Sequence, residues 1–343
     1  MTFQNILIVK LSAIGDVIHA LPVAHALKNC FPQAKVTWVV EKPALELVSS
    51  HPYIDEVIIF EKARCRSLSD LRAYLPGFVR QLKERKFDLT LDLQGLFKSG
   101  LIASLSGAPK RFVYNNTREF SNWMSKRVSG PNQYGHIVEQ YLDVVRALGC
   151  SPEIVDFGIQ FNEQEINSAK EILKTAGWQG ESYVVLAPGA NWPNKRWPTA
   201  HFAALIERLN EQDIHVVITG GPGDLLLAAE ICSTTNSPVI NVTGKTGLKQ
   251  LAWIIKNAQV TVGGDTGPMH LSAAVKTPTV ALMGPTDTKR NGPYGEGHTA
   301  LVTPRECAGC WKRKCKKQLD CLEAITVEGV FTALLGLYRE GLK

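Results

Sequence analysis

The sequence predicts an α/β protein with two doubly wound domains. Short apolar runs alternate with amphipathic helical segments along its 343 residues, and this rhythm is typical of parallel sheets with helices on both faces. The rhythm restarts after a polar stretch at 161–182. We therefore expect one domain at 1–168 and a second at 169–343, and a hydrophobic content of 45% can supply a core for each.

The predicted strands are the apolar runs of the two halves. They fall at 6–9, 35–40, 57–60, 89–93 and 112–114, and then at 183–187, 215–219, 239–242, 260–262 and 279–283. A last amphipathic helix is predicted at 327–342. Because doubly wound sheets bind ligands outside the carboxyl ends of their strands, functional residues are expected in the turns after these strands, facing a central cleft.

Charge and composition restrict the class of protein. The formal net charge is +6, and fourteen Lys and Arg residues fall between positions 61 and 127. As a group they favour an anionic partner, such as a nucleic acid, a membrane surface or a phosphorylated substrate, although each alone could be a solvated surface charge. No apolar run reaches the roughly 20 residues that span a bilayer. Since Lys10 also interrupts the first run, neither a transmembrane helix nor a cleavable signal is predicted, and a cytoplasmic protein is expected.

The stretch GGDTGPMHLSAA (263–274) follows a predicted strand. Its two initial glycines permit a tight turn, and a helix is predicted to begin near Met269. Backbone N–H groups at such a helix start, with the Thr266 hydroxyl and Gly267, suit a diphosphate. Asp265 could instead cap the helix, but capping does not explain His270 one turn further on.

A second glycine-containing turn, APGANWPNKRWP (187–198), also follows a strand. Gly189, Ala190 and Asn191 form a loop of small residues, and Lys195 stands just before the next predicted helix. A lysine there can carry its ammonium to a phosphate, although an exposed loop lysine is the alternative.

The third turn, ITGGPGD (218–224), ends in Asp224, which could accept hydrogen bonds from ribose hydroxyls or cap the next helix. The three turns together describe a nucleotide-diphosphate pocket. The sequence lacks the P-loop pattern G-x-x-x-x-G-K-[ST], which argues against an ATPase and favours a nucleotide sugar as the ligand.

The first predicted strand-to-helix turn carries a carboxylate, in ILIVKLSAIGDVIHALPVAHAL (6–27). A carboxylate beside a helix N-terminus stays ionised and can take a proton from an incoming hydroxyl. Asp16 is therefore the candidate general base, and the alternative is that it caps the helix at 17–27.

Polar and basic residues follow other strands of the first half. We expect Arg64, Arg66, Gln94, Lys98 and Arg118 to form a site for an anionic acceptor, because arginine suits bidentate recognition of carboxylate or phosphate.

Four stretches, VKLSAIGDVIHALP, DLQGLFKSG, PGANWPNKRWP and GGDTGPMHLSAA…ALMGPTD, resemble in order and spacing the lipopolysaccharide heptosyltransferases of glycosyltransferase family 9, over roughly residues 5–300. The resemblance implies the GT-B architecture of two Rossmann-like domains. It also implies transfer of heptose from ADP-heptose to the Kdo region of the inner core, with inversion at the anomeric carbon.

The resemblance further implies roles for single residues. Asp16 matches the family's general base and Lys195 its diphosphate-binding lysine. The donor-binding positions correspond to Asp265, Thr266, Gly267 and His270, and Arg64, Arg66, Lys98 and Arg118 fall near the family's acceptor site. The implied mechanism is a single displacement without an obligatory metal. An acceptor such as Kdo-bearing lipid A at the inner leaflet explains the basic first half better than nucleic acid does, and implies a peripheral position at the inner face of the cytoplasmic membrane.

Eight cysteines in a chain without an export signal are expected to be thiols or metal ligands rather than disulfides. Four of them, Cys307, Cys310, Cys315 and Cys321, fall within fifteen residues, but only the first pair has the usual zinc-ligand spacing. A structural zinc site, a redox-sensitive thiol cluster and unligated cysteines remain open.

Three alternative functions are retained. One is a heptosyltransferase that acts on an already heptosylated core. Another is a sugar-nucleotide epimerase of GT-B architecture, which would leave the basic face of the first domain without a role. The third is a non-catalytic nucleotide-binding module, which would not need Asp16.

Overall fold

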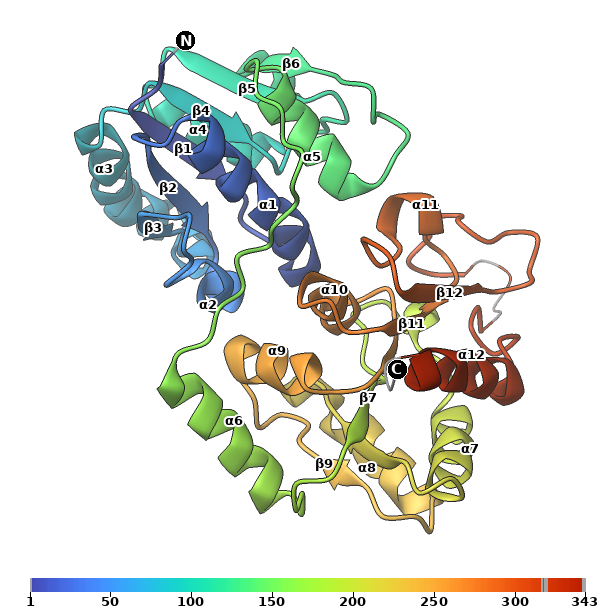
Figure 1. Cartoon of the computed structure of the whole chain (residues 1–343). Helices are drawn as coiled ribbons and strands as arrows, with labels where there is room; N and C mark the ends of the chain where they lie inside the picture. Colours follow the sequence, from blue (N-terminus) through green and yellow to red (C-terminus); the bar gives the residue numbers. More distant parts are fainter. Residues whose placement is uncertain (1, 316, 318–319, 341–343) are drawn as a thin grey trace. The chain divides into compact units, whose positions relative to one another are not determined.

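The computed structural model describes residues 2–315, 317 and 320–340. The chain divides into two compact units, residues 1–160 and 161–343 (Figure 1). Each unit contains a six-stranded sheet in which all neighbouring strands run parallel. The predicted fold class of two doubly wound sheets is confirmed.

The first unit has the strand order β3-β2-β1-β4-β5-β6. Its strands are β1 (Asn5–Val9), β2 (Lys35–Val40), β3 (Glu56–Ile59), β4 (Leu89–Asp92), β5 (Lys110–Tyr114) and β6 (Lys126–Val128). Its helices are α1 (Ile14–Cys30), α2 (Leu45–Val48), α3 (Leu68–Glu84), α4 (Phe97–Leu105) and α5 (Ile137–Arg146), with short 3-10 turns η1 (Lys42–Ala44), η2 (Lys62–Cys65) and η3 (Ser121–Trp123).

The core of this unit forms because β1 is covered on both faces. Ile6 to Val9 are completely buried, as expected for a central parallel strand, which reads as a continuous apolar run. On α3, Tyr74, Phe78 and Leu82 recur every four residues and pack into the core beside β1 and β2.

The second unit has the order β12-β11-β10-β7-β8-β9, which is the same topology as in the first. Its strands are β7 (Tyr183–Ala187), β8 (His215–Ile218), β9 (Ile240–Asn241), β10 (Thr261–Gly264), β11 (Thr279–Met283) and β12 (His298–Val302). Its helices are α6 (Glu163–Thr175), α7 (Thr199–Asn210), α8 (Leu225–Thr234), α9 (Leu248–Lys256), α10 (Gly267–Ala274), α11 (Thr288–Asn291) and α12 (Val327–Glu340), with 3-10 turns η4 (Pro193–Lys195) and η5 (Pro222–Asp224).

The predicted elements agree with the structure within a few residues, with two omissions. The edge strands β6 and β12 were not predicted, because they are short and partly exposed and lack a run of buried apolar residues. Helix α10 begins at Gly267 rather than near Met269, with Pro268 in its first turn. Residues 341 and 342 of the predicted last helix lie outside the described residues.

The expectation that none of the cysteines forms a disulfide is wrong for one pair. Cys30, the last residue of α1, is bonded to Cys150 with a Cα–Cα distance of 5.7 Å. The pair meets because α1 and α5 pack side by side (Figure 1). A separation of 120 residues in the chain gives no sequence signal for this contact.

No helix in the described part of the chain is both long enough and apolar enough to cross a bilayer.

Candidate active site

The three predicted nucleotide-binding turns meet in the second unit. Strands β7 and β10 are neighbours, with Ala187 opposite Gly263. The chain continues from β7 to β8 and from β10 to β11, in opposite directions along the sheet. This reversal marks the switch point where such sheets bind ligands. A Cβ on Gly264 would lie 2.3 Å from the Lys195 carbonyl oxygen, and one on Gly189 would lie 2.3 Å from Cγ of Asp224. Glycine at both positions therefore allows the turns to come together.

A buried ionic group forms where these turns join. The Lys195 ammonium lies 2.6 Å from Oδ2 of Asp265, and Nε2 of His270 lies 2.9 Å from Oδ1 of the same carboxylate. The Asp265 side chain is only 3% exposed and that of Lys195 14%. Trp192 lies 4.6 Å from the Lys195 ammonium and adds a cation–π contact.

Asp265 stays ionised despite its burial. Burial alone raises the pKa of the carboxyl, but the hydrogen bond and charge of His270 and the Lys195 ammonium outweigh it, so the pKa lies well below its ordinary value. The capping alternative for Asp265 does not hold, because the N-cap residue of α10 is Thr266. The Thr266 hydroxyl donates to the Gly264 carbonyl at 3.3 Å.

The remaining predicted donor residues line the same edge of the sheet. Asp224 accepts a hydrogen bond from the Gly221 N–H at 2.9 Å, which stabilises the turn before α8. The Ala190 carbonyl accepts from Nε of Arg196 at 2.9 Å, which holds the loop of Gly189, Ala190 and Asn191. The sequence thus identified residues that the fold brings together within this unit.

The cysteine-containing segment supports the loop that carries Lys195. Asn194 donates to the Lys312 carbonyl at 2.6 Å, and the Gly309 N–H donates to the Gly284 carbonyl at 2.9 Å, beyond the end of β11. Burial raises the pKa of the Cys321 thiol, and the nearby Cys315, Cys310 and Cys307 raise it further.

The predicted zinc site gains no support from this geometry. Among residues 2–315, 317 and 320–340, no group of three or more His, Cys, Asp or Glu could hold a metal ion.

In the first unit, Asp16 and Gln94 lie at the corresponding switch point, after β1 and β4. Asp16 is the third residue of α1, and its Oδ2 accepts the Ala13 N–H at 3.2 Å, so it does help to cap the helix. The Gln94 Oε1 accepts the N–H groups of Leu11 at 3.1 Å and Ser12 at 3.3 Å. Gln94 therefore fixes the loop that leads to Asp16. Its oxygen is used by the two backbone N–H groups, so its amide nitrogen is the group that can contact the acceptor substrate.

Lys10 is a charged residue that the sequence reasoning treated only as an interruption. It is 2% exposed, and its ammonium donates to the Tyr141 hydroxyl at 2.7 Å and to the Leu93 carbonyl at 3.1 Å. Burial alone would lower the pKa of Lys10, but Tyr141 and the carboxylates of Asp16 and Asp92 outweigh it and raise it. Its place directly after a central strand was the sequence signal that could have identified Lys10 as a site residue.

Asp92 is the counterpart of Lys10 at the end of β4. Burial raises its pKa to about 6, although the N–H groups of Gly95 and Gln94, the Ser99 hydroxyl and Lys10 all oppose the rise. The carboxylate accepts the Gln94 and Gly95 N–H groups at 3.0 Å each. Asp92 thereby shapes the turn that presents Gln94.

The structure brings the predicted acceptor residues only partly together. Lys98 pairs with Glu41 at 2.5 Å. Burial raises the pKa of Cys65, which lies between Arg64 and Arg66, and the charge of Lys98 opposes this rise. The Arg118 N–H donates to the Gly95 carbonyl at 2.8 Å, which ties its loop to the start of α4. Arg64 is half exposed and lies over the Tyr74 ring, while Arg66 and Arg118 are exposed.

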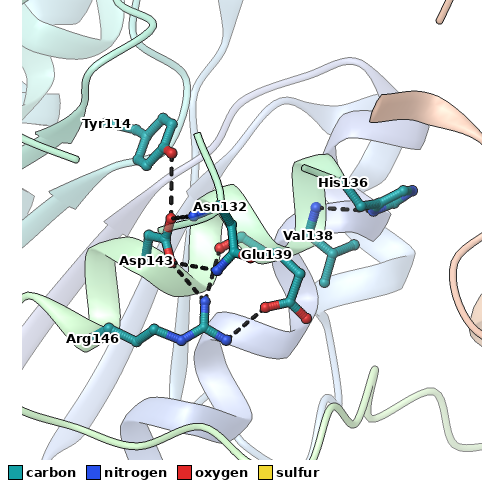
Figure 2. Close-up of polar contacts among 7 residues, drawn as sticks. All are labelled: Tyr114, Asn132, His136, Val138, Glu139, Asp143 and Arg146. Carbon is teal, nitrogen blue, oxygen red and sulfur yellow. Dashed lines mark hydrogen bonds and ion pairs between the residues drawn. The ribbon is translucent and has the colours of Figure 1, made fainter. Parts of the chain in front are cut away.

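A hydrogen-bonded network centred on Asp143 holds the loop before α5 (Figure 2). The buried Asp143 carboxylate accepts from the backbone and side-chain nitrogens of Asn132, both at 2.9 Å, and pairs with Arg146 at 2.7 Å. Arg146 also binds Glu139 at 2.6 Å. Burial and Asp143 raise the pKa of Tyr114 to about 12.

The same loop delivers a histidine to the helix of Asp16. His136 caps α5 by accepting the Val138 N–H at 3.2 Å (Figure 2), and its ring meets the His19 ring edge-on at 5.5 Å. His19 lies three residues after Asp16 on α1, so the two side chains share a helix face. Sequence reasoning did not identify this histidine pair.

A model of the family described as glycosyltransferase family 9 (heptosyltransferase) matches residues 77–320. The chain belongs to glycosyltransferase family 9. The predicted resemblance and the prediction of a glycosyltransferase enzyme are thereby confirmed, and they leave the epimerase and the non-catalytic module without support.

Relatives of this family 9 chain include lipopolysaccharide heptosyltransferase 1 of Pseudomonas aeruginosa, 30% identical over 92% of this chain and 88% of the relative. Lipopolysaccharide heptosyltransferase 3 of Escherichia coli is 27% identical over 80% of this chain and 81% of the relative. The chain is a heptosyltransferase of the lipopolysaccharide core.

Solved structures of family members have the same fold. A glycosyl transferase family 9 structure from Veillonella parvula has a TM-score of 0.88 at 25% identity, covering 99% of this chain and 98% of that one. The E. coli heptosyltransferase WaaC with ADP has a TM-score of 0.78 at 25% identity, covering 97% and 100%.

Proposed function

We propose that this family 9 enzyme transfers heptose from ADP-L-glycero-β-D-manno-heptose to the Kdo region of lipopolysaccharide, as a heptosyltransferase I does. The observation that carries the proposal is that Asp16 and Lys195, the candidate base and the candidate diphosphate ligand, each lie at the switch point of their own sheet. The similarity to a heptosyltransferase 1 and to a structure that contains ADP supports this donor.

In this proposal, the donor diphosphate binds to the Lys195 ammonium and the N-terminus of α10. Asp265 holds the lysine beside that helix end, and His270 in turn contacts the Asp265 carboxylate. Asp224 would accept the ribose hydroxyls, and the small residues Gly189, Ala190 and Asn191 would let the donor approach the backbone.

The proposed reaction is a single displacement with inversion. Asp16 takes the proton of the acceptor hydroxyl while the hydroxyl oxygen forms a bond to the anomeric carbon of heptose. The bond from that carbon to the diphosphate breaks at the same time, and ADP leaves with the electron pair. Lys195 and the α10 N-terminus would stabilise the charge that develops on the leaving group.

The proposed acceptor is an anionic Kdo-bearing lipid A at the inner face of the cytoplasmic membrane. The basic side chains of Arg64, Arg66, Lys98 and Arg118 would suit its carboxylates and phosphates. The similarity to a heptosyltransferase 3 favours one alternative, an acceptor whose core already carries heptose.

Mass spectrometry of Kdo2-lipid A incubated with ADP-heptose and the protein tests the proposal. One added heptose is expected with the unmodified protein and none with Asp16→Asn. The asparagine keeps an oxygen for the Ala13 N–H, so loss of transfer would report on the base rather than on the helix cap. Transfer only to a heptosylated core would favour the alternative, and full activity of Asp16→Asn would contradict the base assignment.

A zinc ion among Cys307, Cys310, Cys315 and Cys321 would be structural in this scheme. Elemental analysis of purified protein tests it, and a zinc content far below one per chain would eliminate it.

A further inference from the structure

Four large apolar side chains of α4, of η3 and of the residue before η3 are exposed. Phe97 is 53% exposed, Leu101 39%, Phe120 65% and Trp123 79%. The two elements pack together, because a Cβ on Gly100 would lie 3.3 Å from Cα of Ser121. The Phe120 and Trp123 rings lie 5.0 Å apart. We call these four residues the aromatic patch, and a patch of this kind marks an interaction surface rather than scattered surface residues.

The backbone holds Phe120 in an unfavourable conformation. Glu119 and Phe120 have φ values of 56° and 60°, a left-handed region that bulky side chains rarely adopt. The turn is secured on both sides, since the Phe97 N–H donates to the Glu119 carboxylate at 3.3 Å and the Arg118 N–H to the Gly95 carbonyl at 2.8 Å. The result is a phenyl ring presented to solvent by an anchored turn.

The chain segment that carries the aromatic patch is rich in basic residues. Residues 61–127, which include all of the patch, contain fourteen Lys and Arg against six Asp and Glu. A cavity of about 760 Å³ adjoins Trp123 and is lined by Lys110, Arg111 and Lys126 together with Phe3 and Phe112. Aromatic walls and three cations suit a ligand with an anionic head and an apolar body.

We propose that the aromatic patch and the adjoining basic cavity bind the surface of an anionic phospholipid bilayer. Trp is enriched at the headgroup level of membranes, Phe and Leu form the apolar face of helices that lie in the interface, and neighbouring lysines add attraction to anionic lipids. In this arrangement Phe120 and Trp123 enter the headgroup region, and Lys110 and Lys126 pair with lipid phosphates.

The inference deepens the proposed function, and its biological purpose rests on that function. Helix α4 begins directly after the turn of Gln94 and carries Lys98 in its first turn. The bilayer contact and the proposed acceptor residues therefore share one element of the first unit. A protein held to the bilayer by α4 and η3 would meet a lipid-linked acceptor with that turn.

Vesicle co-sedimentation tests the proposal with the full chain. The unmodified protein is expected to sediment with vesicles of phosphatidylcholine and phosphatidylglycerol, and less with phosphatidylcholine alone. Phe120→Ser with Trp123→Ser should weaken binding to the mixed vesicles about tenfold or more. Lys126→Glu should weaken it about tenfold only where phosphatidylglycerol is present. Ile154→Ser, which removes another apolar side chain that is 72% exposed in the same unit, is the matched control and should bind normally.

The outcomes separate this proposal from the proposed function. The double variant should unfold at the same temperature as the unmodified protein and still transfer heptose to a Kdo acceptor lacking acyl chains. If the unmodified protein fails to bind mixed vesicles, or the folded double variant binds as well as the control, the bilayer proposal is overturned. A double variant that loses self-association instead of vesicle binding would make the aromatic patch a contact between copies of the chain, which also overturns it. Vesicle binding without any transfer would contradict the proposed function alone.

Discussion

Replacing Asp265 with asparagine removes the negative charge between Lys195 and His270. The Lys195 ammonium loses its partner at 2.6 Å and, among the described residues, keeps the main-chain carbonyl of position 265 at 3.3 Å and the Trp192 ring. Breaking a buried ion pair from one side destabilises a protein by about 3–5 kcal/mol. Because the Lys195 side chain is 14% exposed and can turn toward water, we expect the lower end, a fall of about 3 kcal/mol in the free energy of unfolding.

Urea unfolding at pH 7, followed by tryptophan fluorescence, measures this change. Five of the seven tryptophans lie in the second unit, so the signal reports mainly on the unit that contains Asp265. Lys195→Met should lower the free energy of unfolding much less in the Asp265→Asn background than in the unmodified protein, because the lysine charge is already unpaired there. Similar costs in both backgrounds, or a loss below about 1 kcal/mol for Asp265→Asn, would refute the assignment of a coupled pair.

The pH dependence of this difference follows from the sign of the shift. The pKa of Asp265 is lower in the folded than in the unfolded protein, so its stabilisation is present above the ordinary carboxyl pKa of about 4 and is lost as the pH falls toward the folded value. The free-energy gap between the unmodified protein and Asp265→Asn should be constant from pH 8 to about pH 5 and shrink in stronger acid. A gap that widens on acidification would contradict the direction of the shift.

Three further predictions concern the first unit. Because burial raises the pKa of Asp92 to about 6, its contribution is favourable below the ordinary pKa near 4 and is lost as the pH rises through about 6, a difference of about 3 kcal/mol. Asp92→Asn should flatten this part of the stability–pH curve, and an unchanged curve would contradict the raised pKa. Asp16→Ala should lower the free energy of unfolding by about 1 kcal/mol through loss of the helix cap, whereas Asp16→Asn should lower it less; chemical denaturation measures both, and equal losses would argue against the cap. Asp143→Ala should cost about 3–5 kcal/mol, since it leaves Arg146 and Asn132 without their buried acceptor, and thermal unfolding beside the exposed Ile154→Ser control would detect it.

The central strands could be predicted from the sequence because burial on both faces demands continuous apolar runs. The edge strands β6 and β12 do not meet that condition, and they lack a comparable apolar run. The turns that meet in the second unit were also predictable, since Gly264 and Gly189 are required where backbone and side chains approach closely. The partners of charged residues were not: the pairings of Lys10 with Tyr141 and of Cys30 with Cys150 join positions more than a hundred residues apart.

The Gln94 side chain shows a different limit. Its residue type and its place after β4 predict a ligand of the acceptor substrate, and the structure adds that its oxygen accepts hydrogen bonds from the backbone of Leu11 and Ser12. A polar residue at a switch point can serve the neighbouring turn as readily as a substrate, and the sequence alone does not distinguish the two uses.

The two sheets share one strand order, and this repetition has a consequence for how such enzymes diversify. Asp16 follows the first strand of its unit and Lys195 the first strand of the other, while Asp92 ends the fourth strand of the first unit and Asp265 follows the fourth strand of the second. Each half thus carries candidate site residues on its own packed core. Under the proposed function, mutation can change the acceptor in the first half while the second half keeps its nucleotide sugar, and chimeras that exchange residues 1–160 between family members would test that division.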